Sequence, residues 1–531
     1  MLATVALLFF SYWPVVQNFR GAPTDRYYYG QSEYPIDMLS NLSLIQQGYQ
    51  GQLLAWFNLS TMIVGHPSIL KIEYTIVGLL GRLLNLSPIV MFMVSRFVIS
   101  LFVLGVIYVI IRRVFSEPWQ RFISYVFVIF GTGMTLPGVS NKLITDGVFQ
   151  RLTQTMHHYL LGAGTILLAL FFLSRALESP KRTGMFLLSL LFGIFASLFN
   201  GPNNVLLVSG FPLYIVFDSI SVYFRSKRVR IDMVKVGILF AYSAVTLASI
   251  LYVYYVTTYV WSDIRLAHMD YLNPFRVTPI EYVAIVGVLY ILSFIAIPSV
   301  IRKGKPFMVL LATWLVMHPV GEFILSPILH FNYLRYFLTP YYFAFGILAT
   351  SGLTTLSGWI QKYVRAVSRQ VILVLLVTAV LASSIGTYIS SWQEQHLCFC
   401  AGQYFDFGYP KRTVADGIFW LSENTKPDDI VLSGYFAGAL IPAFAGNRVY
   451  VSWWYRLIEP PTIGNTEANL AAFYGGTMSD SDAYAFLKRE NISYVFYSEQ
   501  EQTFAAGKAD LQYPFLTDRY NKAGTVIYQV K

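Results

Sequence analysis

Long apolar segments alternate with short polar connections along the first 390 residues of the chain. A helix needs about 20 mostly apolar residues to cross a bilayer, and about eleven segments approach that length. They are centred in 2–16, 88–111, 122–137, 159–173, 185–199, 205–224, 236–258, 282–301, 307–325, 339–356 and 371–390. Internal Gly and Pro are compatible with this interpretation because both are common in membrane helices. The pattern predicts a polytopic helix bundle whose first span is an uncleaved anchor.

Basic residues are concentrated in every second connection. One set of connections holds 17 Lys and Arg in 45 residues and consists of 112–121, 175–182, 225–235, 302–305 and 358–369. The alternate set holds 9 in 122 residues and consists of 19–87, 139–156, 200–202, 259–279 and 327–337. Since loops rich in Lys and Arg stay in the cytoplasm, we expect a plasma-membrane or inner-membrane protein. Its N-terminus should be cytoplasmic and its C-terminal part extracytoplasmic.

The chain changes character after residue 391. Short β-rich runs at 429–433, 448–452, 492–497 and 524–529 enclose two helix-like stretches, 413–424 and 480–489. Ser479 or Asp480 would cap the second of these helices. Strands that alternate with helices predict a small α/β domain. We therefore expect a membrane domain over 1–391, with a large first outer loop at 19–87, and an extracytoplasmic α/β domain over 392–531.

Composition supports the membrane assignment. Charged residues make up 12% of the chain and hydrophobic residues 55%, whereas soluble domains carry about 25% charged residues. This excludes a disordered chain, an ordinary soluble enzyme and a disulfide-stapled secreted module. The net charge of +10 does not indicate nucleic-acid binding, because the basic clusters flank the spans. Cys398 and Cys400 are closer in sequence than a relaxed disulfide allows, so two thiols are expected rather than a bridge or a metal site with His396.

The first outer loop is the most distinctive polar region. At 69 residues it is too long for a simple connector, and 36–47 and 68–84 are predicted to be amphipathic helices near the membrane surface. Such a loop above a bundle is typical of half an active-site cleft. For each acid the alternative is a solvated surface charge. The loop's titratable candidates are Asp25, Glu33, Asp37, His66 and Glu73.

Other polar residues lie within or beside apolar segments. Arg96 stands about two turns into the second span, where a charge costs about 3 kcal/mol unless it is paired or hydrated. An acid of the first loop or a phosphate would suit its planar guanidinium. His318 and Glu322 are four residues apart and are expected on one helix face, as a structural or a catalytic pair. Further outer-side candidates are His157, His158, Asn200, Asn203, Asn204, Asp263, His268, Asp270, His330 and Arg335.

Common nucleotide and hydrolase motifs are absent from the sequence, namely GxxxxGK[ST], HExxH and GxSxG. The His and Cys spacing offers no strong zinc site. A donor substrate would therefore have to be activated already and available in the membrane. No cofactor is indicated; a divalent cation is compatible with this chemistry, but no residue pattern points to one.

Several segments resemble the GT-C superfamily of membrane glycosyltransferases, which includes protein O-mannosyltransferases and the lipid A aminoarabinose transferase. The segment 34–51 with His66-Pro67 resembles the family's acid-containing loop, and Asp37 falls where the family places its acid. Arg96 resembles the arginine of the next span. The segment 334–340 is similar to an Arg-containing entry to a late span. The segments 418–432 and 445–451 resemble the appended outer domain of bacterial relatives. The family's paired acids are not present, since Met38 follows Asp37, so Asp25 and Glu33 stay open as alternatives.

The resemblance implies transfer of a sugar from a polyprenyl-phosphate donor to a protein, glycan or lipid acceptor on the outer face. Asp37 would be the general base, and Arg96 and Arg335 would bind the donor phosphate. Membrane lipids are expected partners, and nucleic acid is not. The remaining site candidates are His66, His157, His318 and Glu322.

Two other functions remain as alternatives. A transporter or flippase would favour polar groups at mid-bilayer and paired broken helices, whereas the polar groups here lie at the outer boundary and no internal repeat is evident. A non-catalytic outer scaffold would use the tail to bind a partner or a sugar polymer. Trp453-Trp454-Tyr455 would suit stacking on carbohydrate in that case.

Overall fold

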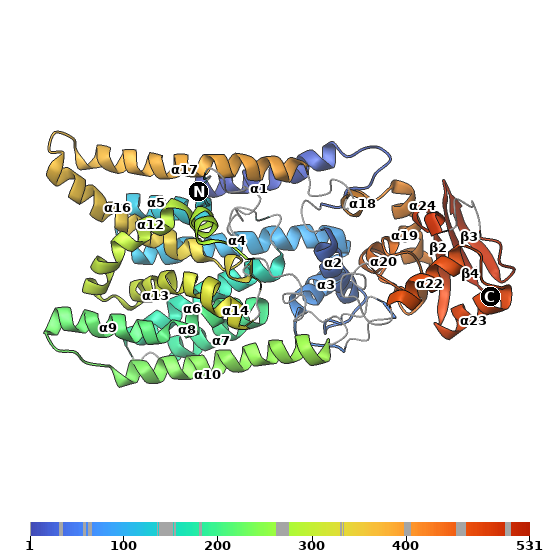
Figure 1. Cartoon of the computed structure of the whole chain (residues 1–531), viewed down its shortest axis with the longest axis horizontal. Helices are drawn as coiled ribbons and strands as arrows, with labels where there is room; N and C mark the ends of the chain where they lie inside the picture. The colour runs from blue at the N-terminus through green and yellow to red at the C-terminus, as the bar shows by residue number, and fades with distance from the viewer. Residues whose placement is uncertain are drawn as a thin grey trace. The chain divides into compact units, whose positions relative to one another are not determined.

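The computed structural model divides into two compact units (Figure 1). The helical unit comprises 1–13, 96–254 and 270–394, and the outer unit comprises 14–95, 255–269 and 395–531. The structure describes residues 2–30, 35–56, 60–61, 66–134, 136, 152, 156–179, 183–261, 276–329, 332, 334–397, 405–452, 463–504 and 511–531.

Within these ranges, nine helical segments are long and apolar enough to cross a membrane. They are α1 (Leu2–Arg20), α4 (Pro88–Val114), α6 (His157–Glu178), α7 (Thr183–Asn200), α10 with η2 (Met233–Tyr255, Val256–Val260), α12 (Pro279–Lys303), α13 with η4 and α14 (Pro306–Val320, Gly321–Leu325, Ser326–Leu329), α16 (Tyr341–Tyr363) and α17 (Arg369–Leu397). A tenth span is formed if α8 (Pro202–Ser209) and α9 (Phe211–Ser226), bent by 41°, are counted as one. The chain is a mainly α integral membrane protein, as predicted.

One predicted span is too short. The segment centred in 122–137 forms α5 (Pro118–Phe130), which has 13 residues, fewer than the roughly 20 that a bilayer requires. Its apolar side is buried, with Val128 and Ile129 fully enclosed. The apolar pattern of α5 therefore reflects burial within the helical unit. Short α15 (Leu334–Phe337) completes the helices of this unit.

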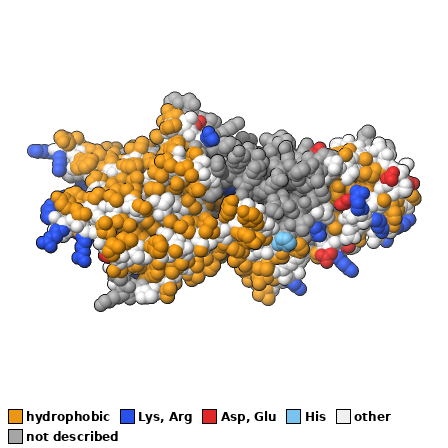
Figure 2. All heavy atoms as spheres, turned by 60° about the horizontal axis from the view of Figure 1, so that its bottom comes forward, with side chains coloured by type: hydrophobic (Ala, Val, Ile, Leu, Met, Phe, Trp, Pro, Cys, Tyr) orange, Lys and Arg blue, Asp and Glu red, His pale blue; other side chains and the backbone are white. Residues whose placement is uncertain are grey.

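The helical unit presents apolar side chains outward. Figure 2 shows hydrophobic side chains over the face turned to the viewer, with Lys and Arg gathered at one end of this unit. Leu251, Phe240 and Leu375 are among its exposed apolar residues, while Leu167 and Ile347 are fully buried. An apolar exterior around an equally apolar interior suits a lipid environment. The basic end matches the alternation of Lys and Arg among the connections.

Besides η2 and the ends of spans, the described residues of the outer unit form eight helices and one sheet. The helices are α2 (Pro35–Tyr49), α3 (Ile72–Leu84), α18 (Phe405–Gly408), α19 (Arg412–Asn424), α20 (Ala437–Phe444), α22 (Ile463–Tyr474), α23 (Asp480–Arg489) and α24 (Glu499–Phe504). The strands are β1 (Ile430–Leu432), β2 (Ile492–Tyr497), β3 (Leu516–Lys522) and β4 (Thr525–Val530). Their order is β1-β2-β4-β3, with β1 parallel to β2 and antiparallel pairing elsewhere. The predicted α/β character of the tail is confirmed.

Two details of the tail differ from the sequence prediction. The predicted strand 448–452 makes only isolated pairings at Val449, one with Val431 and one with Ser60. The unpredicted β3 pairs with β4 through a two-residue turn, because Lys522 faces Thr525 across the hairpin. Both turn residues have positive φ, 47° at Ala523 and 85° at Gly524, which is the signature of a type I′ hairpin turn. Ser479 caps α23 by accepting from the backbone N–H of Asp482, as expected.

The two predicted loop helices differ from each other. Helix α3 is amphipathic and exposes Ile76, Leu80 and Leu83, as an interfacial helix would. The expectation for 36–47 is wrong, because α2 is buried on most of its surface between α3 and α20. A β-carbon at Gly48 would lie 2.0 Å from the carbonyl oxygen of Thr75. Glycine therefore permits the close approach of α2 and α3.

Backbone pairings join the first outer loop to the C-terminal segment. Arg26 pairs with Lys411 in an isolated bridge, and Ser60 pairs with Val449. The Tyr29 hydroxyl donates to the carbonyl of Phe407 at 2.8 Å. Helix α2 joins the same framework by packing against α20 and α18 of the C-terminal segment.

Candidate functional site

Asp37 is the exposed position of an otherwise enclosed helix. Twelve of the fifteen α2 residues are buried, whereas Asp37 is exposed in the first turn of the helix. The backbone carbonyl of Asp37 accepts from the Ser40 hydroxyl at 2.9 Å. A carboxylate in the first turn is stabilised by the helix dipole. The fold therefore fixes the backbone of Asp37 while leaving its carboxylate accessible.

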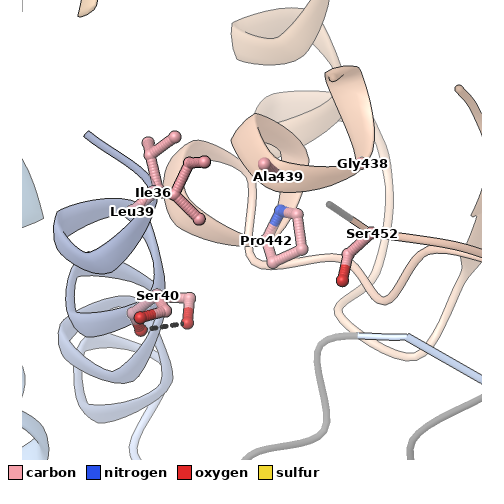
Figure 3. Close-up of a pocket in the computed structure, with 8 residues that line it drawn as sticks. Ile36, Leu39, Ser40, Gly438, Ala439, Pro442 and Ser452 are labelled. Carbon is pink, nitrogen blue, oxygen red and sulfur yellow. Dashed lines mark hydrogen bonds between the residues drawn. The ribbon is translucent and has the colours of Figure 1, made fainter. Parts of the chain in front are cut away.

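A small pocket lies beside the N-terminal half of α2. Figure 3 shows Ile36, Leu39 and Ser40 of α2 on one side, with Ala439 and Pro442 of α20 on the other. Its volume is about 10 Å³, room for about one water molecule, and its lining is mainly apolar. Asp37 is not part of that lining. That Asp37 borders a cavity reaching Arg96 stays a prediction.

The other sequence candidates of the first loop differ in environment. Asp25 is a surface acid, its side chain 70% exposed, and its carboxylate lies 3.8 Å from the guanidinium of Arg26. Arg26 in turn pairs with Asp406. His66 is exposed, and its backbone carbonyl accepts from the indole of Trp261 at 3.0 Å. Glu33 lies outside the described residues.

Glu73 is a buried acid of this loop. It lies in the first turn of α3 and is 9% exposed. Burial raises the pKa of Glu73 to about 7, against the opposing effect of nearby Lys71. Its Oε1 atom has no hydrogen-bond partner in the described part of the chain. Sequence analysis named Glu73 but did not favour it, although its four-residue spacing from Val77, on the buried side of α3, was a usable signal.

Arg96 of the helical unit is enclosed by its neighbours and only 2% exposed. The hydroxyl of Tyr12 from α1 interacts electrostatically with its guanidinium, and the Tyr12 ring packs edge-on against Phe97 at 5.5 Å. The Ser100 hydroxyl donates to the Arg96 carbonyl at 2.8 Å. The sequence predicted an acid or a phosphate beside Arg96. The structure places the Tyr12 hydroxyl near the Arg96 guanidinium.

Arg335 meets the beginning of α6. Its guanidinium donates to the Tyr159 hydroxyl at 3.0 Å, and the Tyr159 ring lies 4.1 Å from that of His158. His157 is buried one position earlier. Arg335 itself is half-buried, so the structure brings together a cation and the His157–Tyr159 segment that are far apart in sequence.

Asn200 and Asn203 lie near the same part of α6. The Asn200 side chain donates to the carbonyl of Leu338 at 3.4 Å. A β-carbon on Gly162 of α6 would lie 2.8 Å from the Asn200 side chain and 3.4 Å from that of Asn203. The helical unit therefore gathers α6, α7, α8 and the region after α15 around a group of buried amides.

His318 and Glu322 do not pair with each other. The Nδ1 atom of His318 shares a hydrogen bond of 2.8 Å with the Tyr282 hydroxyl. Glu322 is fully buried in the π-helix η4, and neither carboxyl oxygen has a hydrogen-bond partner among the described residues. π-Helical turns occur frequently at functional sites. The sequence led us to expect these two residues on one helix face as a structural or a catalytic pair, and it did not reveal Tyr282, which lies 36 residues from His318.

The described residues contain no group of three or more His, Cys, Asp or Glu side chains placed to hold a metal ion. Several other candidates fall outside the described residues, or have no described side chain: Asp263, His268, Asp270, His330, His396, Cys398, Cys400 and Trp453-Trp454-Tyr455.

No family model and no curated protein matches the sequence. The structure is similar to that of the Archaeoglobus fulgidus oligosaccharyltransferase tethered to an acceptor peptide with an NVT sequon, at a TM-score of 0.54 and 13% identity. That match covers 100% of this chain and 74% of the other. The same enzyme with an inhibitory peptide and a dolichol-phosphate matches at 0.51 and 14% identity, with the same coverage. ArnT from Cupriavidus metallidurans bound to undecaprenyl phosphate matches at 0.51 and 11%, covering 99% of this chain and 97% of that one.

These similarities extend over the membrane bundle and the outer part alike. The chain is an integral membrane protein with a long loop after its first span and a small α/β region. Its fold is the GT-C fold of membrane glycosyltransferases, as the sequence resemblance implied.

Proposed function

We propose that the chain is a membrane glycosyltransferase that moves a sugar from a polyprenyl-phosphate donor to an acceptor on the outer face of the membrane. The observation that carries this proposal is the full-length similarity to two enzymes solved with a lipid phosphate, dolichol-phosphate in one and undecaprenyl phosphate in the other. Both neighbours share the GT-C fold with this chain. The position of Asp37, exposed on a rigidly held helix, supplies an acid suited to such a reaction.

In the proposed reaction, the acceptor oxygen forms a bond to the anomeric carbon of the donor while the bond from that carbon to the phosphate oxygen breaks. Asp37 takes the acceptor's proton, and the lipid phosphate leaves with the bonding electron pair. Arg335, half-buried and hydrogen-bonded to Tyr159, would stabilise the departing phosphate, as would Arg96. Neither role requires a nucleotide.

The proposal also includes an orientation of the chain in the membrane. The connections rich in Lys and Arg would lie in the cytoplasm together with the N-terminus, and the outer unit would be extracytoplasmic. A polyprenyl-phosphate sugar would then reach the reaction centre from within the bilayer.

The test compares acid variants in a transfer assay with purified protein in nanodiscs, synthetic polyprenyl-phosphate sugars and membranes that supply acceptors. Asp37→Asn should lower turnover about 100-fold while retaining donor binding, because the amide keeps the shape but cannot take a proton. Asp25→Asn is the matched control, since Asp25 is also an exposed outer acid, and should keep near-normal turnover. Equal losses in both variants, or normal turnover in Asp37→Asn, would contradict the assignment. Donor movement across the bilayer without transfer would favour a flippase.

A further inference from the structure

Two connections of the helical unit meet at one end of its helices. One is 227–232, between α9 and α10, and the other is 304–305, between α12 and α13; both lie at the same end of the unit in Figure 1. A β-carbon at Gly304 would lie 1.9 Å from the Ser221 hydroxyl and 3.0 Å from the Nη2 atom of Arg225. The φ of Gly304 is 60°, so a glycine lets the turn after α12 close on the C-terminal part of α9.

This packing gathers basic side chains from both connections and from the helix ends beside them. The acids of α9 and of its connection to α10 have other partners. Asp218 pairs with Lys235 at 2.8 Å, and Asp232 accepts from the backbone N–H groups of Val234 and Lys235 at the start of α10. A surplus of positive charge therefore remains at the surface. The exposed cations include Arg225, Lys227, Arg228, Arg230, Lys303 and Lys305.

Large apolar side chains alternate with cations along the first of these connections. Val229, Ile231 and Met233 are 75%, 52% and 71% exposed, and Arg228 and Arg230 precede the first two of them. Contact of such side chains with water is unfavourable, whereas a bilayer surface accommodates both kinds of side chain at once. The apolar groups enter the acyl-chain region, and the cations stay at the level of the phosphates.

The same connection begins in a defined conformation. The Lys227 N–H donates to the Tyr223 carbonyl at 2.8 Å, and the Ser226 hydroxyl donates to the Arg228 carbonyl at 3.3 Å. The Nε atom of Arg225 donates to the carbonyl of α9 one turn earlier, also at 3.3 Å. These bonds hold the backbone before a ligand binds, which lowers the entropic cost of placing the cations around it.

We propose that these two connections form a binding site for the phosphate groups of anionic phospholipids. Guanidinium groups bind phosphate oxygens in pairs, and clusters of Lys and Arg beside membrane helices attract anionic lipid. The exposed Val229, Ile231 and Met233 favour a lipid over a free phosphate, because an ion in solution would leave these side chains in water. Helix α10, which follows this connection, also exposes Phe240 and Leu251, as a lipid-facing helix does. The site is independent of the proposed sugar transfer.

The test measures which lipid lies beside this connection in the full-length protein. Cys398→Ser and Cys400→Ser remove the native thiols, and Ser226→Cys, at an exposed position, carries a bimane fluorophore. The protein is placed in phosphatidylcholine nanodiscs with an equal small fraction of acyl-spin-labelled phosphatidylglycerol or phosphatidylcholine. Labelled phosphatidylglycerol should quench the fluorophore about threefold more strongly than labelled phosphatidylcholine.

Two variants remove cations from one connection each. Arg228→Gln with Arg230→Gln should abolish the preference for phosphatidylglycerol, because the phosphate loses both guanidinium groups of the first connection. Lys303→Gln with Lys305→Gln should lower the preference, and it decides the question alone if the first variant does not fold. A preference that is unchanged in these variants, or equal quenching of the wild type by the two labelled lipids, would overturn the proposal.

Two further arms separate this site from a general basic surface and from a site for free phosphate. Val229→Ser with Ile231→Ser should lower quenching by both lipids, because the connection would no longer enter the acyl-chain region. Arg112→Gln with Arg113→Gln is the matched control, since these are adjacent exposed cations at the end of α4, and it should behave as the wild type. An equal loss in this control would contradict a local site. Loss of the preference in sodium phosphate, but not in sodium chloride of equal ionic strength, would assign the site to free phosphate and contradict the proposal.

Discussion

Glu73 should make the stability of the protein fall as pH rises from 5 to 8. The folded protein retains the Glu73 proton up to about pH 7, because burial raises the pKa of this carboxyl from 4.5 to about 7. The unfolded chain releases the proton near pH 4.5. Between these values the folded state binds more protons, so raising the pH favours unfolding. At 1.36 kcal/mol for each pH unit, the loss from pH 5 to pH 8 is about 2–3 kcal/mol.

The perturbation that isolates this effect is Glu73→Gln, which keeps the side chain's size and removes its charge. The thermal midpoint of Glu73→Gln minus that of the wild type should increase by about 5 °C or more from pH 5 to pH 8. Both midpoints are measured on purified protein in micelles. Asp25→Asn is the control, because Asp25 is an exposed carboxyl whose removal should leave the pH trend unchanged. A constant difference between Glu73→Gln and wild type across this pH range would refute the argument that burial raises the pKa of Glu73.

Three further predictions address other parts of the account. Arg96→Lys should lose most of the transfer activity with normal expression, because an ammonium cannot make a bidentate phosphate contact; full activity would leave Arg96 a structural residue. Gly78→Ala should destabilise the outer unit by about 2 kcal/mol or more in a thermal melt, because the added β-carbon would lie 2.0 Å from the Ile45 carbonyl oxygen. Gly105→Ala is the control, because its β-carbon would meet open space. A cysteine at Arg228 should resist an impermeant thiol reagent in intact cells, whereas one at Lys426 should react, and reversal of this pattern would overturn the topology.

The membrane helices could be predicted because a bilayer requires both a minimum apolar length and internally satisfied backbone groups. Ten of the predicted segments correspond to single or bent spans. The exception, α5, shows the limit of that signal. Val128 and Ile129 are fully buried, and the sequence does not reveal whether apolar side chains meet lipid or protein.

The outer unit was harder to predict where tertiary partners decide the structure. Six of the fifteen α2 residues are polar or charged, as in a surface helix, and the sequence does not show that α3 and α20 would cover α2. Strand β3 lacked the apolar alternation of a half-buried strand because its residues are exposed or only partly buried, and it depends on the turn at Ala523 and Gly524. The Asp37 assignment came from the family resemblance. The environments of Glu73 and His318 required partners that only the folded chain provides.

The central claim is that the chain transfers a sugar from a lipid phosphate with an acid of the first outer loop as base. The most direct measurement follows the lipid product by mass spectrometry after the purified protein is incubated with synthetic polyprenyl-phosphate sugars and acceptor-containing membranes. The account predicts that free polyprenyl phosphate accumulates as sugar appears on acceptor, and that Asp37→Asn abolishes both. Intact donor in the presence of folded wild-type protein, or product formation unchanged in Asp37→Asn, would contradict it.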